Sequence, residues 1–343
     1  ASHGTFAWIN ATWAKQPRHY HAFSQQGVNS WHRLQEELDL PIVWGGSLEW
    51  FASDSRQARL ASDIAEQQAW GEPARMLTSA EAQAREPAVN FHGATQVASS
   101  PRDGAIDPVL VSKALVAAAI QQGAQVLERC EVLCVKHSSD HKGKLLRTRC
   151  GPIEADCVVL ATGPDPAAVK RFGGFDLPQR STPGVIVVTR PVKPLLRGIL
   201  VAPGIHIHQR VDGRLIIGEQ EGAPDNAAHA ARLADRPKRF PNDSVADQHA
   251  QRLLSTTRDY LPSIEETEVD EVIIGWRPLP VDGHPVIGPS PADDRVYVAI
   301  MHSGVSLAAI TGDLVARELA DGVEMALLKP FRANRAFDTK NRY

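Results

Sequence analysis

The stretch that decides the fold is Gly275–Gly288, which reads GWRPLPVDGHPVIG, followed by Arg295–Ile300 (RVYVAI) and His302–Gly312 (HSGVSLAAITG). The first part leaves a strand in a Pro- and Gly-rich loop and re-enters a strand. The last part leads from a strand through a glycine turn into an Ala- and Leu-rich helix. A helix that begins in this way directs backbone N–H groups and the positive end of its dipole at whatever lies above the strand. We therefore expect an anionic group to bind there.

The composition of the chain is that of an ordinary globular protein. Its 343 residues are 43% hydrophobic and 22% charged, with a formal net charge of -3, so its length predicts two domains with a large core. Nothing in this charge balance points to nucleic acid, an anionic membrane surface or a disordered tail, and we expect a small-molecule partner. No apolar run is long enough to span a bilayer and the N-terminus is unlike a signal peptide, which predicts a cytoplasmic protein.

Apolar periodicity and turn residues predict the secondary structure. Helices are expected at 20–38, 54–70, 78–85, 107–122 and 244–260 and from residue 302 onward. Strands are expected at 48–51, 125–135, 157–161, 185–190, 205–210, 214–219, 269–275 and 295–300. The helix at 107–122 is the best delimited, because Asp107 is an N-cap residue, Pro108 takes the first helical position and Gly123 follows the end.

The order of these elements predicts the fold class. Signals of a parallel sheet occur at the beginning, middle and end of the chain, and signals of antiparallel strands interrupt them twice. We therefore predict an α/β plus α+β protein, in which a Rossmann-like parallel-sheet domain is interwoven with an antiparallel-sheet domain. The predicted boundaries are 1–40, 97–180 and 276–330 for the first domain, and 41–96 and 181–275 for the second.

Four cysteines lie close together in the sequence, at Cys130, Cys134, Cys150 and Cys157. They form no CxxC pair, and no histidine stands at a zinc-ligand spacing from them, so we expect no metal site. We expect buried free thiols in strands, because a reducing cytoplasm does not favour disulfides.

These motifs, in this order, resemble the family of D-amino-acid oxidase, glycine oxidase and sarcosine oxidase. The resemblance extends from the C-terminal stretch to Asp103–Pro108 (DGAIDP), Ala161–Gly163 (ATG) and Arg210–Gly218 (RVDGRLIIG). It implies a flavoprotein oxidoreductase that binds FAD in the parallel-sheet domain and its substrate in the antiparallel-sheet domain. The implied reaction oxidises the Cα–N bond of an amino acid or N-substituted amino acid to an imine by hydride transfer to the flavin. The flavin is expected to be non-covalent, since the C-terminal stretch contains no cysteine.

The resemblance also implies which residues contact FAD. The backbone of Val132 is expected at the adenine, and the remaining positions are expected along the phosphates and the flavin: Ser2, His3, Gly4, Ala161, Thr162, Gly163, His302, Ser303, Gly304, Val305 and Ser306. A reduced flavin carries negative charge near N1, so a helix N-terminus at 302–306 favours reduction.

Three residues are candidates for a direct part in the reaction. Arg277 matches the arginine that holds a substrate carboxylate in the family, since a planar guanidinium binds a carboxylate bidentately; a structural salt bridge is the alternative. His302 is expected at the flavin edge. His206 shares a strand face with His208 and is a candidate for the substrate pocket, the alternative being a structural pair of histidines.

Aromatic and amide side chains near the N-terminus extend this candidate pocket. The resemblance places Phe6, Trp8 and Asn10 near the flavin or substrate, and burial of Phe6 and Trp8 as core residues is the alternative.

One departure from the family pattern is large. The family begins with a strand, a GxGxxG turn and a helix that hold the pyrophosphate, and the sequence contains no GxGxxG. The pairs Gly45–Gly46 and Gly173–Gly174 lack the spacing. We expect a gap in the parallel sheet, filled by a preceding segment or by another chain, so an oligomer or a paired subunit is an expected form.

Alternatives to the oxidation reaction follow from this departure. One is a non-catalytic subunit that does not bind FAD by itself, and another is a different two-domain flavin hydroxylase or dehydrogenase. The electron acceptor is either oxygen or a separate redox protein.

Overall fold

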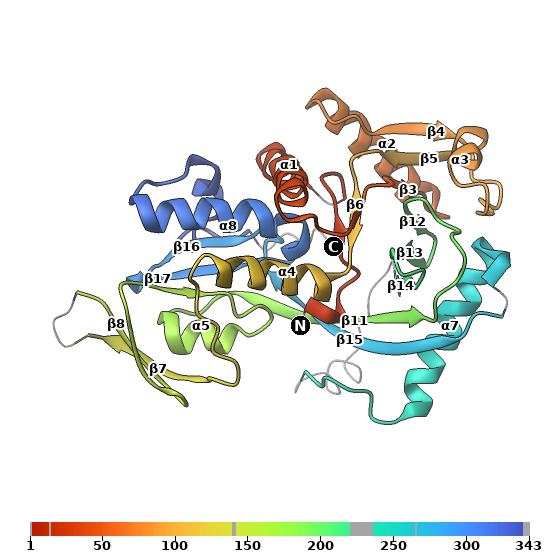
Figure 1. The fold of residues 1–343 in the computed structure, drawn as a ribbon. Coiled ribbons are helices and arrows are strands. Elements are labelled where there is room, and N and C mark those ends of the chain that lie inside the picture. The colour runs from red at the N-terminus through yellow and green to blue at the C-terminus, as the bar shows by residue number, and fades with distance from the viewer. Residues whose placement is uncertain (1, 14, 139–141, 220–235, 265, 339–343) are drawn as a thin grey trace. The chain divides into compact units, whose positions relative to one another are not determined.

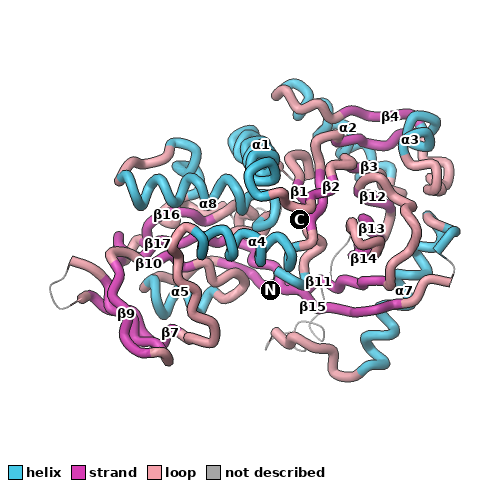
Figure 2. The backbone as a smooth tube through the Cα atoms, viewed as in Figure 1, coloured by secondary structure: helices cyan, strands magenta, loops and turns pink. Residues whose placement is uncertain are grey.

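A computed structural model describes residues 2–13, 15–138, 142–219, 236–264 and 266–338 (Figure 1). The chain divides into two compact units, each made of two separate stretches. Unit 1 comprises Ala1–Ser112 and Pro183–Trp276, and unit 2 comprises Lys113–Thr182 and Arg277–Tyr343. Figure 2 shows helices and strands in both units, and the predicted class, α/β plus α+β, is confirmed. The assignment of domains to FAD and to substrate stays a prediction.

Unit 1 is built on an eight-stranded, mostly antiparallel sheet in the order β15-β11-β14-β13-β12-β3-β5-β4. The strands are β3 (Ser47–Glu49), β4 (Arg75–Thr78), β5 (Gln96–Ser100), β11 (Gln179–Thr189), β12 (Ile199–Ala202), β13 (Ile205–Gln209), β14 (Leu215–Glu219) and β15 (Val269–Pro280). β3 pairs with β12 in parallel. A smaller sheet has the order β1-β6-β2, with β1 (Trp8–Ile9), β2 (Ile42–Val43) and β6 (Gly104–Ile106).

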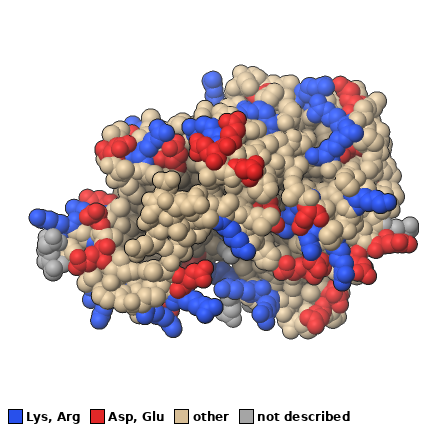
Figure 3. Space-filling model, viewed as in Figure 1, with Lys and Arg blue, Asp and Glu red and all other residues tan. Residues whose placement is uncertain are grey.

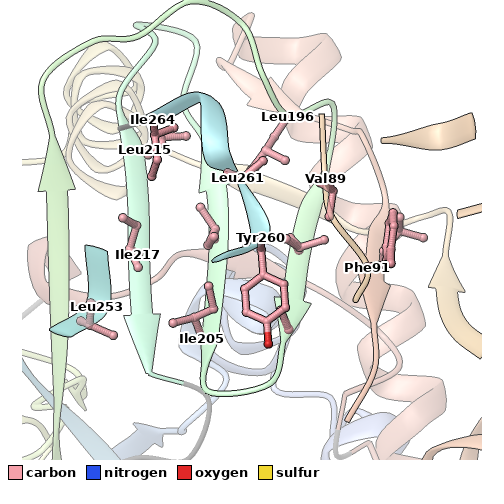
Figure 4. Packing of buried hydrophobic residues seen from close by; sticks show 14 of the residues in the cluster. Val89, Phe91, Leu196, Ile205, Leu215, Ile217, Leu253, Tyr260, Leu261 and Ile264 are labelled. Atoms are coloured by element: carbon pink, nitrogen blue, oxygen red, sulfur yellow. The ribbon is translucent and has the colours of Figure 1, made fainter. Parts of the chain in front are cut away.

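One face of the large sheet forms the main core of unit 1. Alternation along β13 and β14 places Ile205, Ile207, Leu215 and Ile217 on the same face, where all four are fully buried. Side chains of helix α7 (Asp243–Tyr260) and of the segment that follows it cover this face (Figure 4). Full burial of each Leu or Ile contributes roughly 1.5–3 kcal/mol, so this face anchors the hairpin β13–β14.

The remaining helices of unit 1 begin at recognisable caps or breaks. They are η1 (Ser2–Gly4), α1 (Arg18–Leu38), α2 (Asp54–Ala69), α3 (Ser79–Arg85) and η2 (Pro262–Ile264). Thr78 and Glu81 form a capping box at the start of α3, and the Asn242 side chain accepts from the Val245 N–H at the start of α7. Helix α4 (Pro108–Gln121) crosses the boundary between the units.

Unit 2 contains a second pair of parallel strands. β10 (Val158–Leu160) pairs in parallel with β17 (Asp293–Ile300), and β16 (Val286–Ser290) pairs with β17 in the antiparallel sense. Helices α5 (Pro166–Gly173) and α8 (Gly304–Asp321) and the 3-10 helix η3 (Ala326–Phe331) belong to this unit. A separate antiparallel sheet has the order β7-β8-β9, with β7 (Val132–His137), β8 (Lys144–Thr148) and β9 (Gly151–Ala155).

The structure contains elements that the sequence analysis did not predict, among them α5, β4, β5, β6 and β12, and it also differs from the predictions between residues 122 and 156. The predicted strand at 125–135 forms only from Val132 onward. The sequence analysis also missed β8 and β9, whose half-buried residues show no clear alternation of apolar and polar side chains.

The cysteines are free thiols, but the expectation that they are buried was wrong. Cys150 is exposed, and the other three are half-buried. The Cys130 thiol donates to the Thr148 hydroxyl over 3.2 Å, and hydrogen bonds from Cys150 and Thr148 lower the pKa of Cys130. Among the described helices, none is both long and apolar enough to cross a bilayer.

Candidate active site

Two of the predicted cofactor segments follow neighbouring parallel strands in unit 2. Leu160 at the end of β10 is in register with Val298 near the end of β17. Since the carboxyl ends of parallel strands meet at the same edge of a sheet, Ala161–Gly163 and His302–Ser306 leave the sheet at one edge. The structure thus brings together Ala161, Thr162, Gly163, His302, Ser303, Gly304, Val305 and Ser306. We call this the carboxyl edge.

Helix α8 begins at the carboxyl edge with its positive end uncompensated by its own side chains. Ser303 is the N-cap residue, its hydroxyl makes no capping hydrogen bond, and the first turn contains no acidic residue. An 18-residue helix that starts in this way favours an anion at its N-terminus.

The turn after β10 has open space beside Gly163, and side chains of β11 donate hydrogen bonds to its carbonyl groups. Gly163 has a φ of +59°, and a side chain there would meet no atom within 4 Å. The Gln179 side-chain amide donates to the Gly163 carbonyl over 3.2 Å, and the Ser181 hydroxyl donates to the Pro164 carbonyl over 2.8 Å. The Oε1 atom of Gln179 is buried without a hydrogen-bond partner among the described residues. Sequence reasoning missed Gln179, because a glutamine at the start of a strand carries no motif.

These features fit the flavin end of FAD. The carboxyl edge offers a helix N-terminus whose first turn contains no acidic residue, an open glycine turn, and a buried acceptor atom that has no hydrogen-bond partner among the described residues. They do not supply the turn that holds the pyrophosphate, since GxGxxG is absent from the sequence.

Arg277 lies near the end of β15, in the part of the strand that belongs to unit 2. Its side chain makes no ion pair or hydrogen bond with any residue in the described ranges, so the alternative of a structural salt bridge finds no support there. Burial lowers the pKa of the Arg277 guanidinium. A half-buried cation without a counterion is costly, and a carboxylate ligand would relieve that cost.

The segment that contains Ser2, His3 and Gly4 lies in unit 1 against β15. A side chain at Gly275 would overlap the Gly4 carbonyl oxygen, so the two backbones touch, and His3 Nε2 lies 3.3 Å from a Glu271 carboxylate oxygen. Gly275 and Arg277 are alternate residues of β15, so the strand directs them to the same face.

Phe6, His206 and His208 form a cluster on the sheet face opposite α7. The Phe6 ring lies 4.3 Å from the His206 ring and 4.8 Å from the His208 ring, measured between centroids. His206 is half-buried, and a Cβ at Gly218 would lie 2.5 Å from its Nε2 atom, so the imidazole lies across the neighbouring strand β14. The two histidines therefore share one face, as the alternation predicts.

The side chain of His208 makes a structural contact with the backbone of Phe6. Its Nε2 atom lies 2.8 Å from the Phe6 carbonyl oxygen, which requires Nε2 to carry the proton and donate it. Burial, with a smaller contribution from the nearby Arg210, lowers the pKa of His208 to about 4. His208 is therefore neutral at pH 7 and holds the backbone of Phe6 against the sheet.

The Asp103–Pro108 motif organises the segment around Trp8. The Asp103 carboxylate is fully buried and accepts from Trp8 Nε1 over 2.9 Å and from the Ser47 hydroxyl over 2.7 Å. Burial raises its pKa to about 7, although these hydrogen bonds act in the opposite direction. Asn10 is also buried in this unit, and Trp8 packs beside Trp13 with ring centroids 6.0 Å apart.

The second acidic residue of the motif has two partners. One Asp107 oxygen accepts from the backbone N–H groups of Val109 and Leu110 and caps α4, and the other lies 3.1 Å from Arg210. The sequence marked Asp103 and Arg210 as motif positions but did not reveal these contacts.

Val132 lies apart from the carboxyl edge in the sheet order. It is the first residue of β7 and pairs with Thr148, in the separate β7-β8-β9 sheet of unit 2. Its expected contact with adenine stays a prediction, as do the roles of the other named residues.

Comparisons with known proteins agree with this arrangement. A glycine oxidase from Geobacillus kaustophilus (strain HTA426) is 29% identical over 307 residues, which cover 88% of this chain and 77% of that protein. Mitochondrial sarcosine dehydrogenase from Mus musculus is 26% identical over 278 residues, covering 75% of this chain but only 28% of that protein. The crystal structure of glycine oxidase from Geobacillus kaustophilus superposes with a TM-score of 0.84 at 27% identity, covering 98% of this chain and 89% of that one.

A family model adds the decisive observation, because it spans nearly the whole chain. The model described as DAO, FAD dependent oxidoreductase, matches residues 1–318, which include the carboxyl edge, Arg277 and the Phe6 cluster. The cofactor in the family's description, FAD, agrees with the fit of the carboxyl edge to a flavin. This chain therefore belongs to the FAD dependent oxidoreductase family.

Proposed function

We propose that the protein oxidises the Cα–N bond of an amino acid or N-substituted amino acid to an imine, with FAD as the hydride acceptor. The observation that carries this proposal is Arg277, a half-buried cation without an anionic partner among the described residues. The names of two relatives, glycine oxidase and sarcosine dehydrogenase, support a substrate that bears both an amine and a carboxylate.

Arg277 would bind and orient the substrate. A guanidinium holds a carboxylate through two parallel hydrogen bonds, which fixes the direction of the Cα–H bond. Orientation of this kind supplies much of the rate enhancement in a reaction that needs little acid–base assistance. When bound, FAD supplies the hydride acceptor at N5 of its flavin ring.

The N-terminus of α8 would stabilise negative charge at the carboxyl edge. Ser303 through Ser306 form the N-cap and first turn of this helix, and no carboxylate in that turn offsets its dipole. A fixed dipole of this kind stabilises charge that develops during the reaction without reorganisation. His302 precedes the turn, and we assign it to the flavin edge as a positioning group.

His206 would form a wall of the substrate pocket. It packs against Phe6 at 4.3 Å between ring centroids, and Gly218 leaves room for its ring. An apolar and aromatic wall would exclude water from the Cα–N bond and protect the imine until release. The electrons would then pass to oxygen or to a separate redox protein.

The test is anaerobic mixing of the FAD-loaded protein with a panel of amino acids and N-methyl amino acids. We expect at least one member to bleach the oxidised flavin spectrum and to yield one equivalent of 2-oxo acid and amine after hydrolysis of the imine. An unchanged flavin spectrum with every member of the panel would refute the proposal.

A second candidate function is a non-catalytic subunit, and the absence of GxGxxG favours it. In dinucleotide-binding folds, the backbone N–H groups of that turn hold the pyrophosphate. The visible spectrum of the purified chain distinguishes the two candidates. Bound flavin excludes the non-catalytic subunit, whereas a colourless protein that stays colourless with excess FAD supports it.

A further inference from the structure

Two of the four free thiols lie close to each other in the β7-β8-β9 sheet of unit 2. Cys130 precedes β7, and Cys150 lies in the turn between β8 and β9. The two thiols are hydrogen-bonded to each other. Thr148 contacts both residues, because its hydroxyl accepts from the Cys130 thiol over 3.2 Å and from the Cys150 backbone N–H over 3.0 Å. The fold therefore brings together two thiols that are distant in the sequence.

The pairing of β7 with β8 explains why these thiols meet. The Arg149 N–H donates to the Glu131 carbonyl over 3.0 Å, which continues the antiparallel pairing beyond the strands, and the side chains of the same two residues form an ion pair at 2.7 Å. The next position of this pairing places Cys130 opposite Cys150. Directly opposite residues have Cα atoms about 4.5–5.5 Å apart, within the range of about 4.4–6.8 Å that a disulfide bridges. The backbone therefore holds the two cysteines at a separation that suits a disulfide.

Small molecules in solvent can reach this thiol pair. Cys150 is exposed and Cys130 is half-buried. Figure 3 shows acidic and basic side chains over the β7-β8-β9 sheet, and the ion pair of Glu131 with Arg149 is itself exposed. The hydrogen bond between the thiols lowers the pKa of Cys130 and raises the pKa of Cys150. A thiol of lowered pKa reacts first with an oxidant, and an adjacent thiol then completes the disulfide.

The other two thiols have no such neighbour. Cys134 and Cys157 are half-buried, and within the part of the chain that the structure describes neither is hydrogen-bonded to another thiol. They are therefore internal controls for the chemistry of the pair.

We propose that Cys130 and Cys150 are a redox-active thiol pair that a peroxide converts into a disulfide between the start of β7 and the turn that joins β8 to β9. The inference does not rest on the proposed oxidation of a Cα–N bond. Hydrogen peroxide is the product wherever oxygen accepts the electrons of a reduced flavin, so an oxidase would itself generate this oxidant.

The reaction has two steps. The sulfur of Cys130, after losing its proton, attacks one oxygen of the peroxide, so that the O–O bond breaks, a sulfenic acid forms and the first water leaves. The sulfur of Cys150 then attacks the sulfur of Cys130, so that an S–S bond forms, the S–O bond breaks and the second water leaves. The two thiols together lose two protons and two electrons, and the peroxide takes up both.

The test treats the full chain with a stoichiometric amount of hydrogen peroxide and then blocks the remaining thiols with an alkylating reagent. We expect the intact mass before blocking to fall by that of two hydrogen atoms, and the peptides that contain Cys130 and Cys150 to appear as one cross-linked species. Dithiothreitol should restore both thiols. Amide hydrogen exchange of the oxidised chain should slow at the start of β7 and in the turn 149–150, because the cross-link ties these segments together. No amino-acid substrate is present, so the result is separate from that of the substrate panel.

Substitutions assign a role to each thiol. Cys150→Ser removes the second thiol, so Cys130 should stop at the sulfenic acid, which dimedone traps, and no cross-link should form. Cys130→Ser should leave Cys150 reacting with peroxide roughly tenfold more slowly than Cys130 reacts in the wild-type chain. Cys134→Ser is the matched control, because it removes a half-buried thiol of the same sheet, and it should change the rate of disulfide formation less than about twofold.

Four outcomes would overturn the proposal. One is loss of thiols from a wild-type chain, shown to be folded by circular dichroism, without the cross-linked peptide, and another is a wild-type chain whose thiols all survive excess peroxide. A third is suppression of the cross-link by Cys134→Ser as strong as that by Cys150→Ser. The fourth is a disulfide that joins two copies of the chain, which non-reducing electrophoresis detects.

Discussion

At the residue scale, the polar side chains around the candidate site differ in how they are partnered. Arg277 has no charged partner among the described residues, whereas Asp103 accepts two side-chain hydrogen bonds and His208 donates one. Unpartnered groups carry binding function at a cost in stability, and satisfied groups hold the segments around them in place. The partnered groups, His208 and Asp103, lead to two predictions.

The buried His208 makes the folded state sensitive to acid. Its pKa is about 4 in the folded protein, below the ordinary value of 6.5, so the unfolded chain binds a proton first as the pH falls. Its contribution to stability is complete above pH 6.5 and is lost between pH 6.5 and 4, by up to about 3 kcal/mol. Urea unfolding between pH 7 and 4.5 measures this loss. His208→Gln, which retains a donor, should flatten the dependence, and an equally steep profile would contradict the assignment.

Asp103 is expected to be needed for stability. Asp103→Ala leaves Trp8 Nε1 and the Ser47 hydroxyl without their acceptor in the interior, which should lower the free energy of unfolding by about 3 kcal/mol. Asp103→Asn keeps one acceptor oxygen and should cost less than Asp103→Ala. Equilibrium denaturation of both variants checks this order, and equal losses would contradict the hydrogen-bond explanation.

At the scale of elements, the close contact of η1 with β15 sets the position of the N-terminal segment. Gly275→Ala adds a methyl group that overlaps the Gly4 carbonyl oxygen, so the two backbones must separate. We expect a loss of about 1–3 kcal/mol in stability, as in other overpacked sites. Gly312→Ala in α8 is the control, since nothing lies within 4 Å of its added methyl group and helix propensity should raise stability by about 1 kcal/mol. Thermal unfolding of the two variants should shift in opposite directions, and a shift in the same direction would contradict this explanation.

The sequence predicted correctly the elements that have strong local signals. Its predictions failed where the pairing of strands decides the structure. The Asp107 cap and Pro108 located α4 to within a residue, and the turn before Gly304 located α8. The strand predicted at 125–135 failed over its first half because strand formation depends on a neighbour that periodicity does not reveal. Gln179 was missed for a similar reason, since its contact with Gly163 joins positions distant in the sequence.

At the scale of the whole molecule, the chain runs from unit 1 to unit 2 and back before ending in unit 2. Strands β11 and β15 and helix α4 each contain the residues at which it passes between them. The alternation of parallel and antiparallel strand signals along the sequence predicted an interwoven organisation, which no single motif contains. Among the described residues, β10 pairs with β17 and lies at the edge of its sheet.

The central claim is that Arg277 holds the carboxylate of an amino acid whose Cα–N bond is oxidised. The most direct measurement is the anaerobic rate of flavin reduction in the FAD-loaded protein, for wild type and Arg277→Met, with an amino acid from the panel and with its decarboxylated amine. We predict that the substitution lowers the second-order rate constant about 100-fold for the amino acid, as expected for loss of a charge-assisted bidentate contact, and leaves the slow reaction of the amine unchanged. Equal rate constants for wild type and Arg277→Met with the amino acid would contradict the claim.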